Sequence, residues 1–282
     1  MRGRSFKDYL KKVFPGGEKL DLHSSLEIIG DIAILKLPAL SAAQERLLGE
    51  AVAMLNKQVK SVFKQIGPVE GGFRTRGLQL IYGENRTETV HREHGCLLKV
   101  DVSKAYFSPK LQFERRRIAE MVEPWEVVVN MFAGVGSFSM VIAKIAKPAK
   151  VYSIDINPDA VRYLEENIRL NRVESVVEPI LADAKEAAQR LRGTADRVLM
   201  PLPAKAYEYL PYAVQCLKPG GEGWIHYYDF VHAAKGEDPV VKTVEKVARR
   251  LEGKFTISNG RIVRSTGPRW FQTALDIKMT PF

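Results

Sequence analysis

Two glycines and two carboxylates in the second half of the chain have the types and spacing of a nucleoside-binding site. Gly134 and Gly136 separate an apolar run from a helical pattern, and glycines there let the backbone turn tightly beside a helix N-terminus. Asp155 and Asp183 each end a further apolar run, where carboxylates can accept hydrogen bonds from ribose hydroxyls and an adenine amino group. A tight turn or a helix N-cap would explain each feature alone, but together they favour a bound nucleoside.

The elements that must position these residues alternate between strand and helix after Pro124. We expect strands at 126–131, 150–156, 176–181, 196–200 and 223–228, and helices at 137–146, 158–171, 184–191, 204–217 and 239–252. Such alternation predicts a mostly parallel sheet covered by helices on both faces. The last two strands, 255–257 (or on to 263) and 270–279, have no helix between them and should pair antiparallel.

Residues 1–108 have a different pattern, typical of a small α+β domain. We expect a basic helix within 1–20, a strand pair within 26–37 that turns at Gly30 and Asp31, a helix from Ser41, a strand over 59–66, a glycine-rich basic loop at 67–77, and a hairpin of 87–92 with 96–102. A linker helix over 109–123 opens the second domain, 109–282, and should expose its charged residues, Glu114, Arg115, Arg116 and Arg117.

The composition limits the kind of protein and its partners. Lys and Arg number 43 against 33 Asp and Glu, so the net charge of +10 favours a polyanionic partner, although many soluble proteins are basic without one. Two distant cysteines exclude a disulfide framework and a CxxC metal site and fit the cytosol, and we expect no metal. No apolar run approaches the roughly 20 residues that span a bilayer, so we expect no membrane contact.

Seven strands with an antiparallel final pair resemble the class I S-adenosylmethionine-dependent methyltransferases. The resemblance implies an α/β, Rossmann-like fold preceded by the smaller α+β domain, with S-adenosylmethionine as the cofactor. Such enzymes, when they modify nitrogen, often end the fourth strand in an Asn/Asp-Pro-Pro-aromatic turn. This chain has Met-Pro-Leu-Pro at 200–203, and Pro201 has no hydrogen-bond donor, so the segment could be merely a strand exit.

Several ungapped blocks in a fixed order carry a closer resemblance. They are GPVEGGFRTRG (67–77), the long segment 83–115, VVVNMFAGVGSFS (127–139), YSIDINPDAV (152–161), RVLMPLPAKAYEYL (197–210) and GWIHYYDF (223–230). From about Ile28 onward, the chain resembles the archaeal and eukaryotic family that modifies the tRNA guanosine 3′ of the anticodon. That family includes a methyltransferase of ring nitrogen 1 and a wybutosine-pathway aminocarboxypropyltransferase.

The resemblance implies roles for single residues. Arg74 would stabilise the guanine and Glu114 would accept its proton, because a neutral guanine carries a proton on ring nitrogen 1 and is a poor nucleophile. Pro201 would lie at the substrate. The alternatives are a surface ion pair for Glu114 and general phosphate attraction for Arg74. The residues implied at the cofactor are Tyr106, Phe132, Gly134, Gly136, Asp155, Asn157, Asp183 and Pro203.

Three departures from the family pattern leave alternatives open. Pro201 stands where the methyltransferases commonly have Asn, which is compatible with members that also methylate a tricyclic wyosine precursor. Asn130 stands where Asp is usual, and the N-terminal domain of many members is expected to be absent. The last point favours the aminocarboxypropyltransferase branch, whereas Leu202 and Pro203 favour methyl transfer. An RNA-binding module with a vestigial cofactor pocket is the third alternative.

The resemblance also implies a tRNA partner, contacted at its anticodon stem-loop by a monomer. A base taken out of its stack could rest on Tyr207, Tyr227 or Tyr228, unless these rings belong to the core. Phosphate contacts should supply most of the affinity for RNA. They are expected from Arg74, Arg76, Arg86, Arg92, Lys104, Arg115, Arg116, Arg261, Arg264 and Arg269, with Trp270 beside them.

Overall fold

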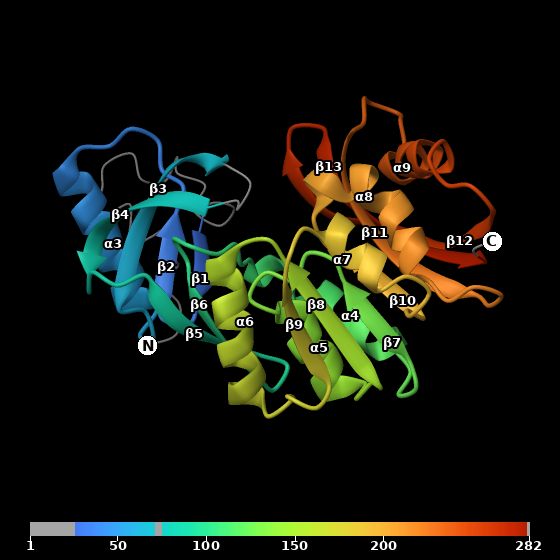
Figure 1. The fold of residues 1–282 in the computed structure, drawn as a ribbon. Coiled ribbons are helices and arrows are strands. Elements are labelled where there is room, and N and C mark those ends of the chain that lie inside the picture. The colour runs from blue at the N-terminus through green and yellow to red at the C-terminus, as the bar shows by residue number, and fades with distance from the viewer. Residues whose placement is uncertain (1–25, 71–74, 281–282) are drawn as a thin grey trace. The chain divides into compact units, whose positions relative to one another are not determined.

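The chain divides into two compact units, which are described separately. The computed structural model describes residues 26–70 and 75–280. One unit consists of residues 1–93 with 97–112, and the other of 94–96 with 113–282 (Figure 1). The division falls after residue 112, whereas the sequence placed the boundary after 108. The helix expected within 1–20 lies outside the described residues.

The first unit holds a four-stranded sheet with one helix packed on it. Its strands follow the order β1 (Leu26–Ile29), β2 (Ile32–Leu35), β3 (Ser61–Glu70) and β4 (Thr75–Gly83), with only β2 and β3 parallel in these described residues. Ser41 and Gln44 form the expected capping box of the helix α3 (Ala42–Leu55). Leu48, Ala51 and Val52 of α3 pack on the apolar side chains of β2 and β3. The expected strand pair and helix are therefore confirmed.

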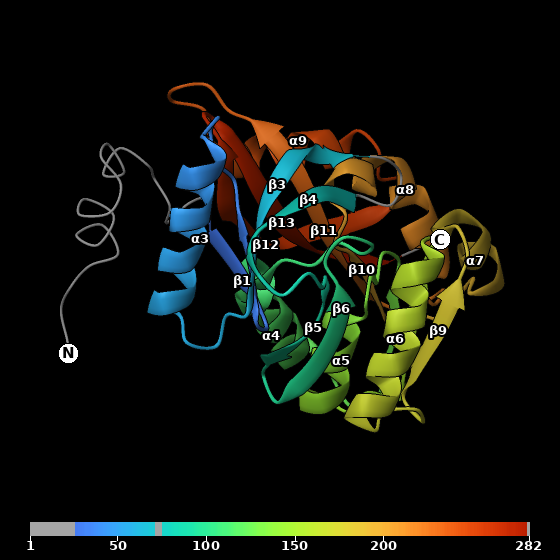
Figure 2. The same cartoon turned by 90° about the vertical axis from the view of Figure 1, so that its left-hand side faces the viewer.

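The segment 67–77, expected as a loop, belongs largely to the paired strands β3 and β4 (Figure 2). Gly67, with φ of 73°, lies at a register shift just after Ile66, and such a bulge accommodates an extra residue. A Cβ on Gly77 would come within 2.9 Å of the Ile66 carbonyl oxygen. These glycines therefore mark a bulge and a close approach of two strands, and the prediction of a loop is wrong for 67–70 and 75–77, whereas 71–74 lie outside the described residues.

The hairpin expected around His94 and Gly95 is confirmed. It pairs β5 (Glu88–Glu93) with β6 (Cys96–Asp101). His94 and Gly95 have positive φ angles of 47° and 77°, as a two-residue turn between twisted strands requires.

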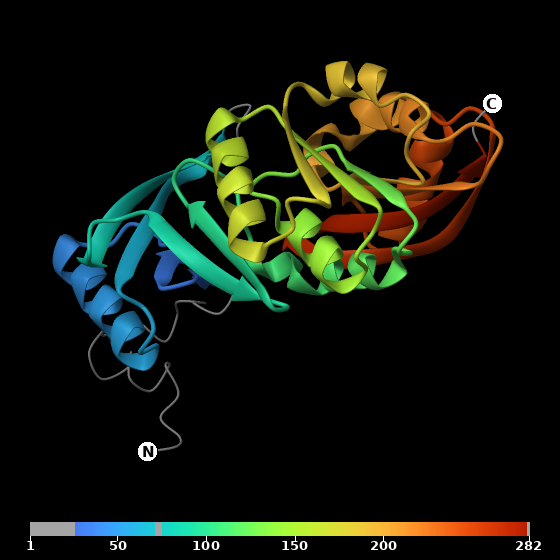
Figure 3. The ribbon, with the colours of Figure 1, turned by 60° about the horizontal axis from the view of Figure 1, so that its bottom comes forward.

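The second unit is a seven-stranded sheet between two layers of helices (Figure 3). The order is β12-β13-β11-β10-β7-β8-β9, in which β13 runs antiparallel to both neighbours and the other pairs are parallel. This is the predicted α/β fold, including its antiparallel final pair. The strands are β7 (Val127–Asn130), β8 (Lys150–Asp155), β9 (Val177–Leu181), β10 (Arg197–Met200), β11 (Gly223–His232), β12 (Lys254–Gly267) and β13 (Trp270–Thr280). The helices are α4 (Gln112–Met121), α5 (Ser137–Ile145), α6 (Pro158–Asn171), α7 (Ala184–Arg190), α8 (Pro203–Cys216) and α9 (Pro239–Ala248).

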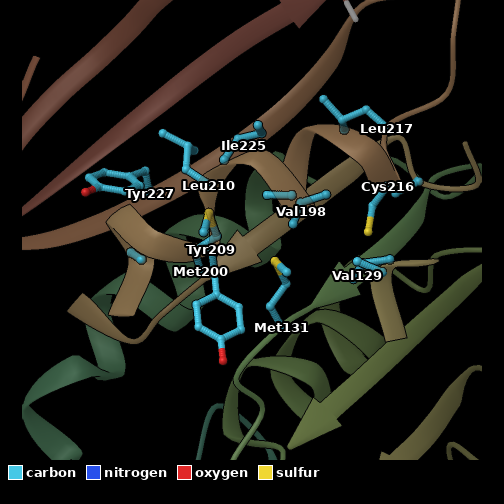
Figure 4. Packing of buried hydrophobic residues seen from close by; sticks show 14 of the residues in the cluster. Val129, Met131, Val198, Met200, Tyr209, Leu210, Cys216, Leu217, Ile225 and Tyr227 are labelled. Atoms are coloured by element: carbon cyan, nitrogen blue, oxygen red, sulfur yellow. The ribbon is translucent and has the colours of Figure 1, made fainter. Parts of the chain in front are cut away.

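Side-chain alternation gives this sheet one apolar face and a second face, here called the polar face, that buries polar side chains beside apolar ones such as Val128 and Leu199. Val129, Val198, Ile225 and Tyr227 turn toward α7, α8 and α9 and build the main core (Figure 4). The intervening residues of the same strands turn to the opposite face. They include Arg197, His226 and Tyr228, which are buried as well, and this polar face carries α4.

Candidate active site

The loop between β7 and α5 makes a turn that depends on glycine. Gly136, the N-cap of α5, has φ of 84°, and a Cβ there would come within 2.4 Å of Leu164 Cδ1. Gly134 also has a positive φ, 55°, and its N–H donates to Asp155 Oδ2 over 2.7 Å. The predicted glycine turn therefore lies directly against the carboxylate that ends β8.

Backbone donors hold the Asp155 carboxylate in place. Its Oδ1 accepts the Asn157 N–H at 2.9 Å, and Asn157 in turn caps α6 by accepting the Asp159 N–H at 3.0 Å. Burial raises the pKa of Asp155, and the backbone hydrogen bonds oppose that shift. Each carboxylate oxygen has more than one lone pair, so Asp155 can accept ribose hydroxyls in addition.

Asp183 joins the start of α7 to an aromatic pair. Its Oδ1 accepts the Lys185 N–H at 2.8 Å, so the N-cap alternative is correct. Its Oδ2 accepts the Tyr209 hydroxyl at 3.0 Å, and burial together with this bond raises the pKa of Tyr209. The Tyr209 ring meets Phe132 edge-on, with 5.1 Å between ring centroids. Sequence reasoning missed Tyr209, which connects Asp183 to the glycine turn through Phe132.

The exit of β10 lies beside that of β7, because the Met131 N–H donates to the Leu199 carbonyl at 3.0 Å. Pro203 is the buried first residue of α8, a position that requires no N–H. The Leu202 carbonyl accepts the first two backbone hydrogen bonds of that helix, both at 3.0 Å. Pro201 is half-buried and, lacking an N–H, can offer a ligand only its carbonyl oxygen as a hydrogen-bonding group.

Glu114 on α4 is buried, with 1% of its surface exposed. Its Oε2 accepts the Tyr228 hydroxyl at 3.0 Å and two N–H groups of Arg117 at 3.0 and 3.2 Å. Arg261 Nη1 lies 3.2 Å from Oε1, and the two guanidinium groups compensate the charge of the buried carboxylate. Within the described residues, no donor has hydrogen-bond geometry toward Oε1.

The expectation that α4 exposes its charged residues is wrong at Glu114 and Arg115, each 1% exposed. Leu111 and Ile118 lie three residues before and four residues after Glu114 and are buried as well, so Glu114 shares the buried side of the helix with them. Two partners of the Glu114 carboxylate, Tyr228 and Arg261, come from β11 and β12, far along the chain. Glu114 is therefore an interior carboxylate and not half of a surface ion pair.

Two further predicted residues have no established relation to this site. Tyr106 belongs to the first unit, where the Arg76 guanidinium lies 6.0 Å from its ring centre. Arg74 lies outside the described residues. Their roles at the cofactor and the guanine stay predictions.

Some of the expected RNA contacts lie in the interior. Tyr227 and Tyr228 are 0% and 1% exposed, so they belong to the core, and their prediction as base platforms is wrong. Arg76 and Arg115 are buried too, so the prediction that they contact phosphate is wrong. Tyr207 is half-buried and stays a candidate platform.

The described residues contain neither a candidate metal site nor a membrane-spanning helix. No group of three or more His, Cys, Asp or Glu side chains in residues 26–70 and 75–280 could hold a metal ion. None of the helices in those same ranges has the length and hydropathy to cross a membrane.

Comparison with known proteins gives two family matches and several relatives. The TRM5/TYW2 methyltransferase domain matches residues 89–256, and the TYW2 N-terminal domain matches residues 6–87. The tRNA (guanine(37)-N(1))-methyltransferase Trm5b of Pyrococcus abyssi is 42% identical, over 92% of this chain and 76% of the relative. The tRNA 4-demethylwyosine(37)-methyltransferase Taw21 of Saccharolobus solfataricus is 38% identical, over 93% and 96%. The tRNA(Phe) (4-demethylwyosine(37)-C(7)) aminocarboxypropyltransferase of Methanocaldococcus jannaschii is 39% identical, over 89% and 96%.

Solved structures agree with these matches. The complex of aTrm5 with tRNALeu matches with a TM-score of 0.84 at 36% identity, covering 99% of this chain and 79% of that one. TYW2 of M. jannaschii, solved in complex with AdoMet, matches with a TM-score of 0.66 at 30% identity, covering 92% and 100%. The TRM5/TYW2 methyltransferase domain matches more than half of this chain, so the chain belongs to the TRM5/TYW2 methyltransferase family.

Proposed function

We propose that this chain uses S-adenosylmethionine to methylate ring nitrogen 1 of the tRNA guanosine 3′ of the anticodon. Its relative Trm5b, at 42% identity, and the aTrm5 structure with bound tRNA support this assignment. The observation that carries it is the buried carboxylate of Glu114, whose Oε1 has no hydrogen-bond donor in the described residues. An acceptor of this kind suits the proton on ring nitrogen 1, whose removal makes that nitrogen nucleophilic.

The groups around the glycine turn suit S-adenosylmethionine. Asp155 offers acceptors to the ribose hydroxyls, Phe132 and Tyr209 offer aromatic surface to the adenine, and Asp183 offers an acceptor to its amino group. When bound, S-adenosylmethionine supplies a methyl group carried on a sulfonium centre. We assign its binding and orientation to these residues and to Gly134, Gly136, Asn157, Pro203 and Tyr106.

Glu114 accepts the guanine proton at Oε1 in this proposal, while Tyr228 and Arg117 hold Oε2. We assign Arg74 to the guanine oxygen, where negative charge develops as the proton leaves. Pro201 can contribute only its carbonyl oxygen, which could accept a hydrogen bond from a guanine N–H. No side chain at this position takes the place of the Asn that is common among the methyltransferases.

We propose tRNA as the partner, contacted at its anticodon stem-loop by a monomer that works in the cytosol. The net charge of +10 supports a polyanionic partner. Arg264 and Arg269 on the β12–β13 hairpin are among the cations that remain candidates for phosphate contact.

Transfer of an aminocarboxypropyl group to a wyosine base is the second candidate function. The 39% identity with the M. jannaschii aminocarboxypropyltransferase supports this candidate. The wyosine methyltransferase Taw21 is 38% identical, so a wyosine precursor is a second substrate to test for methyl transfer. Leu202 and Pro203 match the methyltransferase branch and place methyl transfer first.

Mass spectrometry of the nucleosides decides among these functions. An unmodified tRNA transcript with guanosine 3′ of the anticodon should yield 1-methylguanosine after incubation with the protein and S-adenosylmethionine. A transcript with adenosine there should yield none. An aminocarboxypropyl adduct on wyosine-bearing tRNA would establish the second candidate instead. If no product forms and titration of S-adenosylmethionine into the protein gives no heat, both enzymatic functions are excluded. An RNA-binding module with a vestigial cofactor pocket is then the remaining alternative.

A matched pair of variants on α4 tests the role of Glu114. Glu114→Gln keeps the shape and removes the proton acceptor, so kcat should fall by about 100-fold or more. Glu120→Gln changes a carboxylate on the same helix that is 53% exposed, and its kcat should stay at the wild-type value. Equal kcat values for wild type and Glu114→Gln would refute the assignment of Glu114 as the base.

A further inference from the structure

A continuous set of buried polar side chains runs across the polar face of the sheet to Glu114. Five of its members lie on three strands and one helix, Glu126 directly precedes β7, and the members touch one another in order. They are Glu126, Arg197 on β10, His226 on β11, Asp276 on β13, and Arg117 and Glu114 on α4. We call this set the polar network.

Asp276 stands directly behind the groups that hold Glu114. It is 1% exposed, and its two oxygens accept N–H groups of Arg117 at 2.6 and 3.1 Å. The same Arg117 guanidinium donates to Glu114 Oε2. Burial raises the pKa of Asp276, but hydrogen bonds from His226 and Arg117 outweigh it and lower the pKa overall. Asp276 is thus a carboxylate that fixes how Arg117 meets Glu114.

His226 fixes Asp276 in turn. Its Nδ1 lies 2.6 Å from Asp276 Oδ1, and its Nε2 lies 2.7 Å from Arg197 Nη1. An arginine can only donate, so Nε2 accepts and Nδ1 carries the proton that is given to Asp276. Burial lowers the pKa of His226 to about 4, which keeps the ring neutral at physiological pH. The imidazole is therefore held in one tautomer and one orientation.

The other end of the network holds α4 at a second point. The Arg197 guanidinium binds both oxygens of Glu126, at 2.6 and 2.7 Å, and donates to the Met121 carbonyl at 2.8 Å. Met121 is the last residue of α4, whereas Arg117 lies in its middle. The helix that presents Glu114 is therefore fastened to the sheet by polar contacts at two places.

We propose that Asp276 is a positioning residue for the transfer reaction: by holding Arg117 it keeps Glu114 fixed through Oε2. Oε1, which Arg261 approaches to 3.2 Å without a hydrogen bond, is then left to accept the substrate proton. The inference rests on the proposed role of Glu114 and extends it. Without the Asp276 carboxylate, the freed N–H groups of Arg117 can turn onto Glu114 and occupy Oε1. The acceptor would then be blocked although its own side chain is intact.

A double-mutant cycle separates positioning from general stability. Asp276→Asn should lower kcat by about 10- to 100-fold, the usual cost of losing a partner that orients a functional group, with KM for tRNA and for S-adenosylmethionine unchanged. In a Glu114→Gln background the same substitution should lower kcat no further, because its effect passes through Glu114. Equal falls in both backgrounds would overturn the inference.

Asp229→Asn is the matched control. Asp229 is 2% exposed, lies on the neighbouring strand β11 and pairs with Lys246 at 2.6 Å, but it does not contact Arg117 or Glu114. Its kcat should stay near the wild-type value. If Asp276→Asn does not fold, Arg117→Lys repeats the cycle, since lysine keeps the charge but lacks the fork that binds two carboxylates at once.

Crystal structures of the wild type and Asp276→Asn give a readout without turnover. Arg117 should shift onto Glu114 Oε1, and the Tyr228 hydroxyl bond to Oε2 should lengthen or break. An Arg117 side chain that keeps its wild-type position and leaves Oε1 without a hydrogen bond would contradict the inference whatever the kinetics show. Absence of any transfer by the wild type, with the shift present in the variant, would refute the proposed function and leave the positioning contact established.

Discussion

The buried pair of Arg197 and Glu126 gives a quantitative test of how much the polar network contributes to stability. The two side chains are 2% and 3% exposed and share two hydrogen bonds. Glu126→Gln leaves the Arg197 charge buried without its counter-ion, a change that typically costs about 3–5 kcal/mol. Glutamine keeps one acceptor oxygen, so we expect the loss in unfolding free energy near the lower end, about 3 kcal/mol.

Tryptophan fluorescence during urea unfolding can measure this loss in the correct unit. The three tryptophans, Trp125, Trp224 and Trp270, all belong to the unit that contains the pair. Trp224 also lies 5.5 Å from the Arg197 guanidinium, so it reports on the site itself. The transition midpoint should fall while the slope with urea stays the same.

Glu120→Gln is the reference for that measurement. Glu120 pairs with Arg116 at 2.7 Å, but both side chains are more than half exposed, and such pairs contribute about 0–1 kcal/mol. A loss for Glu126→Gln no larger than the loss for Glu120→Gln would refute the reasoning. It would mean that water or another group compensates Arg197 as well as the carboxylate does.

Two further predictions concern the cofactor and pH. Asp155→Asn should weaken binding of S-adenosylmethionine, measured calorimetrically, by about tenfold or more, because hydrogen bonds to a charged acceptor are worth about 1.5–3 kcal/mol; unchanged affinity would remove Asp155 from the site. The pKa of His226 is lowered from 6.5 to about 4, chiefly by burial, so between these pH values the unfolded chain binds a proton that the folded chain does not. The free energy of unfolding should therefore fall as the pH drops through that window, and His226→Gln should flatten the fall relative to the wild type.

The alternating half of the fold could be predicted from sequence because its signals are local. The apolar runs that became β7 to β11 are bounded by glycine, proline or capping residues, and their expected limits differ from the observed ones by a few residues at most. Asp155 and Asp183 could be placed for the same reason, since each follows directly on a strand. The antiparallel β12 and β13 followed from the absence of a helix between them.

The site on α4 could not be predicted in the same way. Burial of Glu114 depends on Tyr228 and Arg261, which lie more than 100 residues farther along the chain, and no periodicity within α4 signals such partners. The resemblance to a known family pointed to Glu114, but the residues alone favoured a surface ion pair. The strand over 59–66 was predicted, but the end of β3 and the strand β4 were missed for a related reason, because Gly67 and Gly77 look like loop residues until their pairing is known.

Pairing of the last strand has a consequence for how the chain folds. His226 and Asp276 are direct partners in the β11–β13 register, and both face α4. A slip of either strand by one residue would turn its charged and polar side chains into the apolar core beneath α8. It would also turn Ile225 or Ile277 toward the guanidinium groups of Arg117 and Arg197. Shifted pairings of β13 with β11 are therefore much less stable than the native one. The free energy of burying charged groups thus selects a single register for β13, although this strand is synthesised after all its neighbours in the sheet.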